Sequence, residues 1–515
     1  MRSFRLIALF LLPAIASCHH GEQEIVYEPA VRIEISELSA HRASFAVKTI
    51  DAASLRYGVG TGEAPELTQE LETASVKSTE LTLSVGELEA ATDYRIRIQG
   101  IGPGGEEGKV QSLDFSTSPG PASLYYWEKE RSAIPGFADI SLVTLGQHNY
   151  NPPAWTRERF ASHVRYIDGE GGHHWLFEAF LCIDGYDGKR GLSFSITNDR
   201  QSAIKESWED LAEAWLGEHG ALRELDAAVA QAATVLGAPP RPRYVVMSLP
   251  DPVMFQYFSN RNSSTTYWGE LNGRRLDFSR LEDQQAAYRW YMNLCRSRFN
   301  ALNFKHLELA GFYILSEELP LSPDFYTQHG KSFGSADTWN WQYKRWEQLV
   351  PWVSGYAHSC NEGLWWIPYH LAPGYKLWKE LGFDAAFMQP NRYWDHDSIS
   401  HDMSRTVSAL TSYRMGMELE FEYSLVASVM SDGRSGPDGN GAPVFYLKDV
   451  PMLRDRVREY MNAYKQSGLY GVLPLALYSG TDAMHQLASS PDPGDRAMYD
   501  EICRFFIDSP LRSSP

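Results

Sequence analysis

The sequence predicts an α/β protein in which a small all-β domain precedes a (β/α)8 barrel of the TIM type. The spacing of apolar residues changes near residue 119, from alternation with polar residues to apolar runs that are each followed by a helical pattern. Eight such runs follow, which is the number of strands in this kind of barrel. The 515 residues also exceed what one hydrophobic core usually supports, so at least two domains are expected.

The first residues have the order of charged, apolar and small residues that secretory signals have. Arg2 and Arg5 precede an apolar run over residues 6–15, which is too short to span a bilayer, and small residues stand just before Cys18. This arrangement resembles a bacterial lipobox, which implies removal of residues 1–17, diacylation of the Cys18 thiol and a tether over residues 18–24. The expected location is a bacterial membrane, the outer one, at its periplasmic face or at the cell surface. An ordinary secretory signal with an incidental cysteine is the alternative.

Residues 25–118 are expected to form a β-sandwich. Leu88, Thr92 and Tyr94 are spaced like the tyrosine corner of fibronectin type III domains, which this segment resembles. No binding motif occurs here, so we expect a spacer that ends at residues 117–123. Six segments alternate apolar and polar residues between turns, as strands with one buried face do, and they are residues 31–38, 42–50, 54–60, 78–85, 93–101 and 109–117.

The segment from residue 125 to residue 510 carries the strand and helix pattern of the barrel. An open, doubly wound sheet is the competing fold, but it would more often have a glycine-rich phosphate loop after its first strand, and residues 146–153 do not form one. The predicted strands are residues 140–146, 174–183, 243–249, 307–315, 363–369, 384–390, 417–423 and 471–478. The predicted helices include residues 157–167, 221–237, 281–299, 340–359, 402–414 and 453–468.

Polar residues follow the predicted strands, at the end where barrel enzymes build their sites. Two tryptophans in polar sequence, Trp268 and Trp339, are expected to stack on sugar rings, because a flat apolar ring with a polar edge suits such contacts. The strand-end residues that we expect to bind a substrate are His148, Asn149, Asp184, Asp251, His370, Gln389, Asn391, Tyr393 and Tyr478.

Clustered carboxylates mark the ends of the fourth and seventh predicted strands. Glu317 and Glu318 end the fourth strand, and on the seventh strand every second residue from 418 to 422 is a glutamate, so these three side chains should face the barrel interior. Buried anions need cations, hydrogen bonds, protonation or water, and the predicted strands contain almost no Lys or Arg. We expect Glu420 to be a nucleophile, with Glu422 as the alternative, whereas Glu418 stands too close to the start of the strand.

A carboxylate pair from these two strands suits the cleavage of a glycosidic bond. Ser316 and Glu317 loosely resemble the Asn-Glu pair of many retaining barrel glycosidases, in which the Glu is the acid/base. Ser replaces Asn here, and Glu318 takes the role if the register differs by one. A separation of about 5 Å between the two carboxyl groups would give retention of configuration, and about 6.5 to 9.5 Å would give inversion.

Taken whole, the chain resembles a family of lipoproteins from glycan-degrading Gram-negative bacteria that join a fibronectin III-like domain to a glycoside-hydrolase-like barrel domain of unknown function. The residues that carry the likeness are 311–319, 364–391 and 416–422. The likeness implies an architecture and a role in carbohydrate uptake, and it implies no particular reaction. We expect a membrane-anchored retaining glycoside hydrolase that acts on an oligo- or polysaccharide. A noncatalytic glycan-binding lipoprotein with the same cleft and a barrel hydrolase for another polar substrate are the alternatives.

Net charge and cysteine positions indicate which kinds of ligand and partner are not expected. The net charge of −18 argues against nucleic acid, because phosphate binding needs a basic surface. Cys182, Cys295, Cys360 and Cys503 lie far apart and have no His partner at metal-ligand spacing, so neither a metal nor a cofactor is expected. Buried free thiols are favoured, and a bridge such as Cys295 to Cys360 is the alternative in an oxidising compartment. The sequence does not predict an oligomeric state.

Overall fold

The computed structural model describes residues 28–38, 43–86, 88–89, 92–117, 136–145, 154–195, 201–253, 268–334, 345–395, 400–431, 449–480 and 482–513. These residues belong to two compact units, which are described one at a time. The predicted lipidation site Cys18 and its tether lie outside the described residues, and so do residues 118–123 of the predicted domain boundary. Within the described part, no helix is both long and apolar enough to cross a bilayer.

The N-terminal region is all-β, as predicted, and its strands form two sheets. Alternation explains how the strands form: in β2 the side chains turn alternately into the core and into solvent after the first residues. The first sheet has the order β1 (Ala30–Leu38), β2 (Ala43–Ile50), β5 (Ser78–Val85). The second has the order β4 (Gln69–Glu72), β3 (Ser54–Gly60), β6 (Asp93–Ile101), β7 (Gln111–Ser116). The short strand β4, all of whose residues are exposed, has no alternation and was not predicted.

The second unit contains a closed barrel of eight parallel strands, which confirms the predicted fold class. Its strand order follows the chain, and the last strand pairs with the first. The strands are β8 (Asp139–Thr144), β11 (Ala179–Ile183), β12 (Arg243–Leu249), β15 (Leu307–Ile314), β16 (Gly363–Trp366), β17 (Ala385–Met388), β18 (Gly416–Glu420) and β19 (Leu475–Tyr478).

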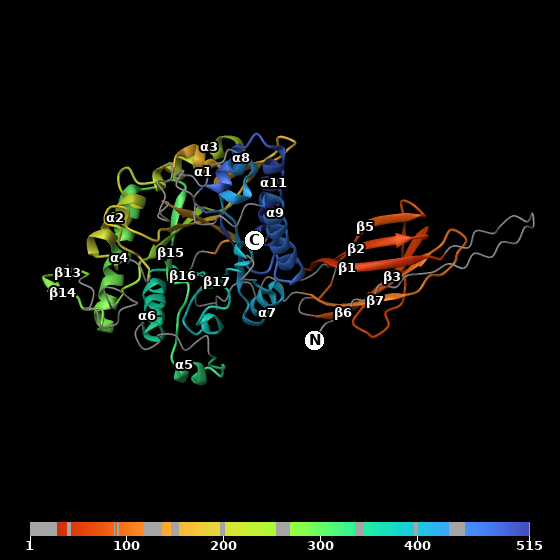
Figure 1. The fold of residues 1–515 in the computed structure, drawn as a ribbon, viewed down its shortest axis with the longest axis horizontal. Coiled ribbons are helices and arrows are strands. Elements are labelled where there is room, and N and C mark those ends of the chain that lie inside the picture. Colours follow the sequence, from red (N-terminus) through yellow and green to blue (C-terminus); the bar gives the residue numbers. More distant parts are fainter. Residues whose placement is uncertain are drawn as a thin grey trace, which may run out of the picture. The chain divides into compact units, whose positions relative to one another are not determined.

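Helices follow the strands and surround the barrel (Figure 1). Aspartates cap several of them; the Asp449 and Asp492 side chains each accept a backbone N–H of the first turn, and a proline follows each cap. The longer helices are α1 (Arg157–Val164), α2 (Lys205–Leu216), α3 (Leu222–Leu236), α4 (Leu281–Leu302), α6 (Trp346–His358), α7 (Met403–Tyr413), α9 (Val450–Gln466) and α11 (Pro493–Ile507). Shorter ones are α5 (Pro323–Gln328), α8 (Ala427–Ser431) and α10 (Ala483–Ser489).

The predicted strand over residues 174–183 is two separate elements. Its first residues form β10 (His173–Trp175), which pairs antiparallel with β9 (Arg165–Ile167) instead of joining the barrel. The chain leaves the ladder because the backbone N–H groups of Leu176 and Phe177 bond to carbonyls at the end of α1. Only the second half, β11, is a barrel strand.

A bulge adjusts the fourth barrel strand just before the predicted acidic cluster. The register between β12 and β15 shifts so that Val245 faces Leu309 and Val246 faces Gly311. Gly311 has φ +149°, and a Cβ there would lie 2.2 Å from the backbone oxygen of Gly363 on β16. Only glycine therefore permits this approach of β15 to β16.

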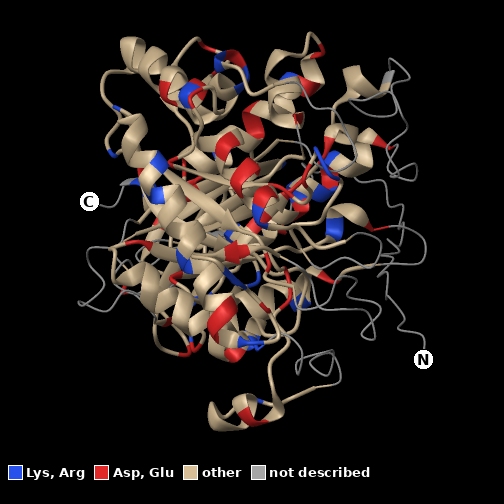
Figure 2. Cartoon of the chain, turned by 90° about the vertical axis from the view of Figure 1, so that its left-hand side faces the viewer, with Lys and Arg blue, Asp and Glu red and all other residues tan. Residues whose placement is uncertain are grey.

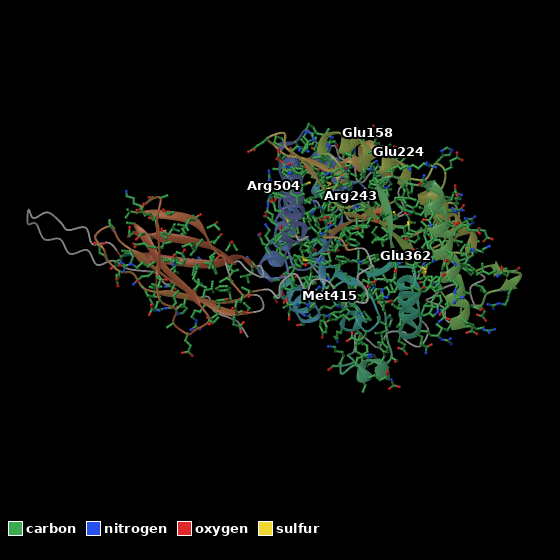
Figure 3. The ribbon with its side chains drawn as sticks, turned by 180° about the vertical axis from the view of Figure 1, so that it is seen from behind. Glu158, Glu224, Arg243, Glu362, Met415 and Arg504 are labelled. Carbon is green, nitrogen blue, oxygen red and sulfur yellow. The ribbon has the colours of Figure 1, made fainter. Side chains whose placement is uncertain are left out.

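Buried charges at the amino end of the strands are matched. Arg512 donates to Asp139, the first residue of β8, at 2.6 Å between Nε and Oδ2. Glu178 accepts the backbone N–H of Ala138 at 2.7 Å and lies 3.8 Å from Arg241. Arg243, labelled in Figure 3, begins β12 at the same end, where burial lowers its pKa to about 10 and the charges of Glu178 and Asp139 oppose that shift.

The cysteines of the described residues are free thiols, and no disulfide joins Cys295 to Cys360. Cys182, Cys295 and Cys503 are buried, as predicted, whereas Cys360 is exposed.

Candidate active site

A cavity of about 450 Å³ opens at the carboxyl ends of the barrel strands. Five carboxyl groups line it, and they belong to Asp184, Glu317, Glu318, Glu418 and Glu420. The other lining residues are Leu142, Thr144, Ile183, Gly185, Ser195, Tyr313, Leu315, Ser316, Tyr369, Gln389, Trp394 and Tyr478. The cavity therefore combines polar groups from most of the barrel strands with a few apolar and aromatic surfaces, as ligand sites do.

Glu317 reaches the cavity from the segment after β15. Its Oε1 accepts a hydrogen bond from the side-chain amide of Gln389 at 3.1 Å. The carboxyl group is exposed to the open cavity, but protein surrounds it on its other sides. This burial raises the pKa of Glu317, and the charge of Glu318 raises it further, while the Gln389 bond opposes the shift.

Glu420 is the last residue of β18, and its carboxyl group accepts more hydrogen bonds than that of Glu317 does. The backbone N–H of Asn391 donates to its Oε2 at 2.7 Å, and the Tyr460 hydroxyl donates to the same oxygen at 3.2 Å. The indole N–H of Trp394 donates to Oε1 at 3.2 Å. Burial still raises the pKa of Glu420 to about 7, although these three donors favour the ionised form.

Glu418 also lines the cavity, and the prediction that it stands too close to the start of the strand was wrong. The strand runs only from Gly416 to Glu420, so residue 418 is two positions from its end and shares a face with Glu420. Glu418 is 1% exposed, and its Oε1 has no hydrogen-bond partner among the described residues. Burial raises its pKa well above the usual value, and the charges of Glu420 and Glu317 raise it further.

Glu422 lies beyond the end of β18 and is not among the residues that line the cavity. Its Oε1 accepts a hydrogen bond from the hydroxyl of Tyr478, at 3.0 Å, and Tyr478 itself lines the cavity. Burial raises the pKa of Glu422 to about 7. Glu422 therefore does not face the cavity itself. Its carboxyl group holds the hydroxyl of Tyr478, a residue that does.

Two further predicted residues meet in the cavity. The Oδ1 of Asp184 accepts the backbone N–H of Leu145 at 3.0 Å and the Thr144 hydroxyl at 3.2 Å. Burial raises the pKa of Asp184 well above the usual value, although these bonds oppose the shift. Glu318 accepts the hydroxyl of Tyr369 at 3.3 Å.

Several predicted substrate-binding residues lie elsewhere. Trp268 is fully buried against Trp208 and Trp290, so its predicted role as an accessible stacking ring was wrong. The residues next to Trp268 in the sequence are polar, and they do not reveal that its ring packs in the core of the folded chain. Asp251 is buried outside the cavity lining, and His370 bonds to Thr406 at 3.1 Å, also outside the lining.

Asn391 and Tyr393 support the site without lining it. Asn391 provides the backbone N–H that bonds to Glu420, and Tyr393 is fully buried with its hydroxyl 2.8 Å from the Ser424 hydroxyl. The remaining predicted residues, His148, Asn149 and Trp339, lie outside the described residues.

Sequence reasoning did not assign Tyr313, Tyr369 or Glu418 to the site. Tyr313 lies on β15 four residues before Glu317, so the same alternation that identified the glutamates could have placed it on the inner face. In the described part of the chain, no three or more His, Cys, Asp or Glu residues are arranged to hold a metal ion.

Comparisons with known proteins find one matching family. A model of the family described as "Domain of unknown function (DUF4855)" matches residues 139–331 and 333–434, which is more than half of the chain. A comparison with curated protein sequences finds no match.

Similar solved structures include a Bacteroides ovatus GH5 xyloglucanase in complex with a XXXG heptasaccharide, at 9% identity and a TM-score of 0.35, over 92% of this chain and 99% of that one. A β-D-glucuronidase of Dictyoglomus thermophilum matches at 10% identity and a TM-score of 0.25, over 77% of this chain and 53% of that one. A human fibronectin type III domain matches 19% of this chain and 94% of its own length, at 14% identity and a TM-score of 0.15. Likenesses this weak do not bear on the reaction.

Proposed function

This chain belongs to the family described as "Domain of unknown function (DUF4855)", and from that premise we propose that it is a glycoside hydrolase that acts on an oligo- or polysaccharide with retention of configuration. One observation carries the proposal. Glu317, after the fourth barrel strand, and Glu420, at the end of the seventh, line the same cavity. Neither carboxylate forms an ion pair with a Lys or Arg of the described residues, so both are free to act on a ligand. Paired carboxyl groups on opposite sides of a substrate are what glycoside hydrolysis requires.

Hydrogen bonding supports different roles for the two carboxyl groups. A nucleophile must be ionised, and Glu420 accepts three donors that favour its ionised form. An acid must hold a proton, and Glu317 accepts a single side-chain donor among the described residues, from Gln389. Burial raises the pKa of both carboxyl groups, so the number of donors is what distinguishes the two roles. We therefore assign Glu420 as nucleophile and Glu317 as acid/base, with Glu318 as the alternative acid.

In the proposed reaction, Glu317 gives its proton to the leaving glycosidic oxygen while the Glu420 carboxylate attacks the anomeric carbon. The bond between that carbon and the leaving oxygen breaks, and a glycosyl ester on Glu420 forms. Glu317, now ionised, takes a proton from water, and the water oxygen displaces Glu420 from the sugar. Trp394 and Tyr369 offer ring surface in the cavity on which a sugar ring can lie.

The experiment that tests the assignment compares two isosteric variants with a matched control. Reducing sugar released from a panel of polysaccharides would first identify a substrate. Glu420→Gln and Glu317→Gln should then each lower kcat by about 10³-fold or more, because an amide can neither form the ester nor donate the proton. Glu308→Gln, an exposed position on the same strand β15, should leave kcat unchanged.

The outcomes separate the candidate functions. Full activity of Glu420→Gln would remove Glu420 from the nucleophile role, and Glu422→Gln would be measured next. Binding of glycans without turnover on any of them would favour the noncatalytic glycan-binding lipoprotein. Retention is checked by NMR of the first anomer formed, since inversion would appear as the opposite anomer.

A further inference from the structure

The cavity has an unbalanced charge. Five carboxyl groups line it, whereas none of its described lining residues is a Lys, Arg or His. Burying carboxylates without cations is costly, so each such group must be protonated, bonded to donors or paired with something that enters the cavity.

Elsewhere among the described residues, several buried carboxylates pair with cations. At the amino end of the strands, Arg512 pairs with Asp139. Arg296 on α4 forms a two-point pair with Glu362, which directly precedes β16, with distances of 2.6 and 2.7 Å, and Arg458 on α9 pairs with Glu501 on α11. Figure 2 likewise shows Lys and Arg residues among Asp and Glu residues on the outer elements of the barrel. The carboxyl groups of the cavity thus differ from these ion-paired carboxylates, because no Lys, Arg or His among the described residues lines the cavity beside them.

Glu418 is the carboxyl group of the cavity that most clearly lacks a hydrogen-bond donor among the described residues. It lies on the inner face of β18, it is 1% exposed, and its Oε1 has no partner among the described residues. Glu420, two residues along, is satisfied by three donors from the protein. A buried carboxyl oxygen without a donor destabilises the fold, so the ligand that completes this cavity should bring a hydrogen-bond donor to Glu418.

We propose that the substrate is a glycan of amino sugars with free amino groups, and that Glu418 receives the ammonium group of the sugar in the cavity. This inference rests on the proposed function and adds the substrate class. A neutral hydroxyl could donate to Glu418 but would bring no charge to stabilise its ionised form, whereas an ammonium group supplies three donors and a positive charge together. A uronic acid or a sulfated sugar would add to the repulsion. Glu418 is accordingly a specificity-determining residue.

The test uses two sets of monosaccharides that differ only at one substituent, because the linkage of the glycan is unknown. The first set is glucosamine, N-acetylglucosamine and glucose, and the second is galactosamine, N-acetylgalactosamine and galactose. Dissociation constants for the mature full-length chain are measured at pH 7 by saturation-transfer NMR. We expect at least one free amino sugar to bind about tenfold or more tightly than its N-acetyl and neutral counterparts. Glu418→Gln should abolish this preference, and Glu308→Gln should preserve it.

A second readout is the number of protons released. Binding of an ammonium group should ionise a protonated carboxyl group, so the heat of binding measured by calorimetry should vary with the ionisation enthalpy of the buffer. Failure of both amino sugars to bind, tighter binding of a neutral or acidic sugar, or an undiminished preference in Glu418→Gln would each overturn the inference. Hydrolysis of a neutral glycan by a protein that rejects amino sugars would overturn it while leaving the proposed function intact.

Discussion

Glu418 and Glu420 lie two residues apart on one face of β18, yet their carboxyl groups have different surroundings. Three protein donors meet Glu420, and the Oε1 of Glu418 meets none in the described residues. Chemically identical side chains can therefore take different roles, since burial favours the protonated form of both but only Glu420 has donors that oppose it.

The effect of burial on these carboxyl groups can be tested at Glu422 by measuring how the free energy of unfolding depends on pH. Its folded pKa is about 7, raised from 4.5 by burial. The folded protein thus holds this proton more tightly than the unfolded chain, so the stability falls as pH rises from about 4.5 to about 7 and the loss is complete above that range. Glu422→Gln does not titrate and still accepts from Tyr478. We expect the variant to be more stable than wild type at pH 8, by up to about 3 kcal/mol at about 1.4 kcal/mol per pKa unit.

The measurement is urea unfolding at pH 4.5 and at pH 8. The difference between Glu422→Gln and wild type should be small at pH 4.5, where the folded protein holds the proton and about half of the unfolded chains do, and it should be complete at pH 8. Glu308→Gln is the control, because residue 308 is exposed. Equal stability of Glu422→Gln and wild type at both pH values would show that the Glu422 carboxyl group ionises without penalty.

At the scale of elements, the segment after β17 connects the two candidate catalytic groups. Gln389 donates to Glu317, and two residues later the backbone N–H of Asn391 donates to Glu420. The turn between them depends on Asn391, whose φ of 58° and ψ of 5° lie in the left-handed region. Asparagine tolerates this conformation better than most residues do.

Substitutions at Asn391 should separate backbone conformation from side-chain chemistry. Asn391→Gly keeps the left-handed turn and should retain kcat within about twofold, because only the backbone N–H contacts Glu420. Asn391→Val should lose about 1 to 2 kcal/mol of stability through the left-handed strain and lower kcat about tenfold or more as the donor moves away from Glu420. Thermal unfolding and kcat on the identified glycan measure both effects. A Gly variant as impaired as the Val variant would instead assign a role to the Asn391 side chain.

The apolar runs of the sequence predicted all eight barrel strands, and their ends were the least accurate part. The predicted strand 417–423 ends at Glu420, and 363–369 ends at Trp366. Phe421 and Ile367 stay buried after the chain has left the ladder, so hydrophobicity alone cannot mark where the pairing stops. The dismissal of Glu418 followed from this error, since a strand believed to be longer placed residue 418 too far from the cavity.

At the scale of the whole molecule, closure of the barrel follows from the repeated strand and helix pattern, and convergence of strands 4 and 7 on one rim follows from closure. The sequence could therefore predict that Glu317 and Glu420 share a site. It could not predict which neighbours complete that site, because the donors to Glu420 come from Tyr460 on α9 and from the segment after β17. Such partners are set by how helices pack on the barrel, and local patterns do not encode this packing.

Attachment to a membrane would depend on the part of the chain that precedes the described residues. We propose that Cys18 is diacylated, because Arg2, Arg5, a short apolar run and small residues precede it in the order of a lipoprotein signal. Two acyl chains suffice for stable anchoring, whereas one gives only reversible binding. In a Gram-negative host, the wild-type chain should incorporate labelled palmitate and sediment with the membranes. Cys18→Ser should do neither, and Cys360→Ser, which removes an exposed thiol, should behave as wild type. An unlabelled wild-type chain in the periplasmic fraction would establish an ordinary secretory signal instead.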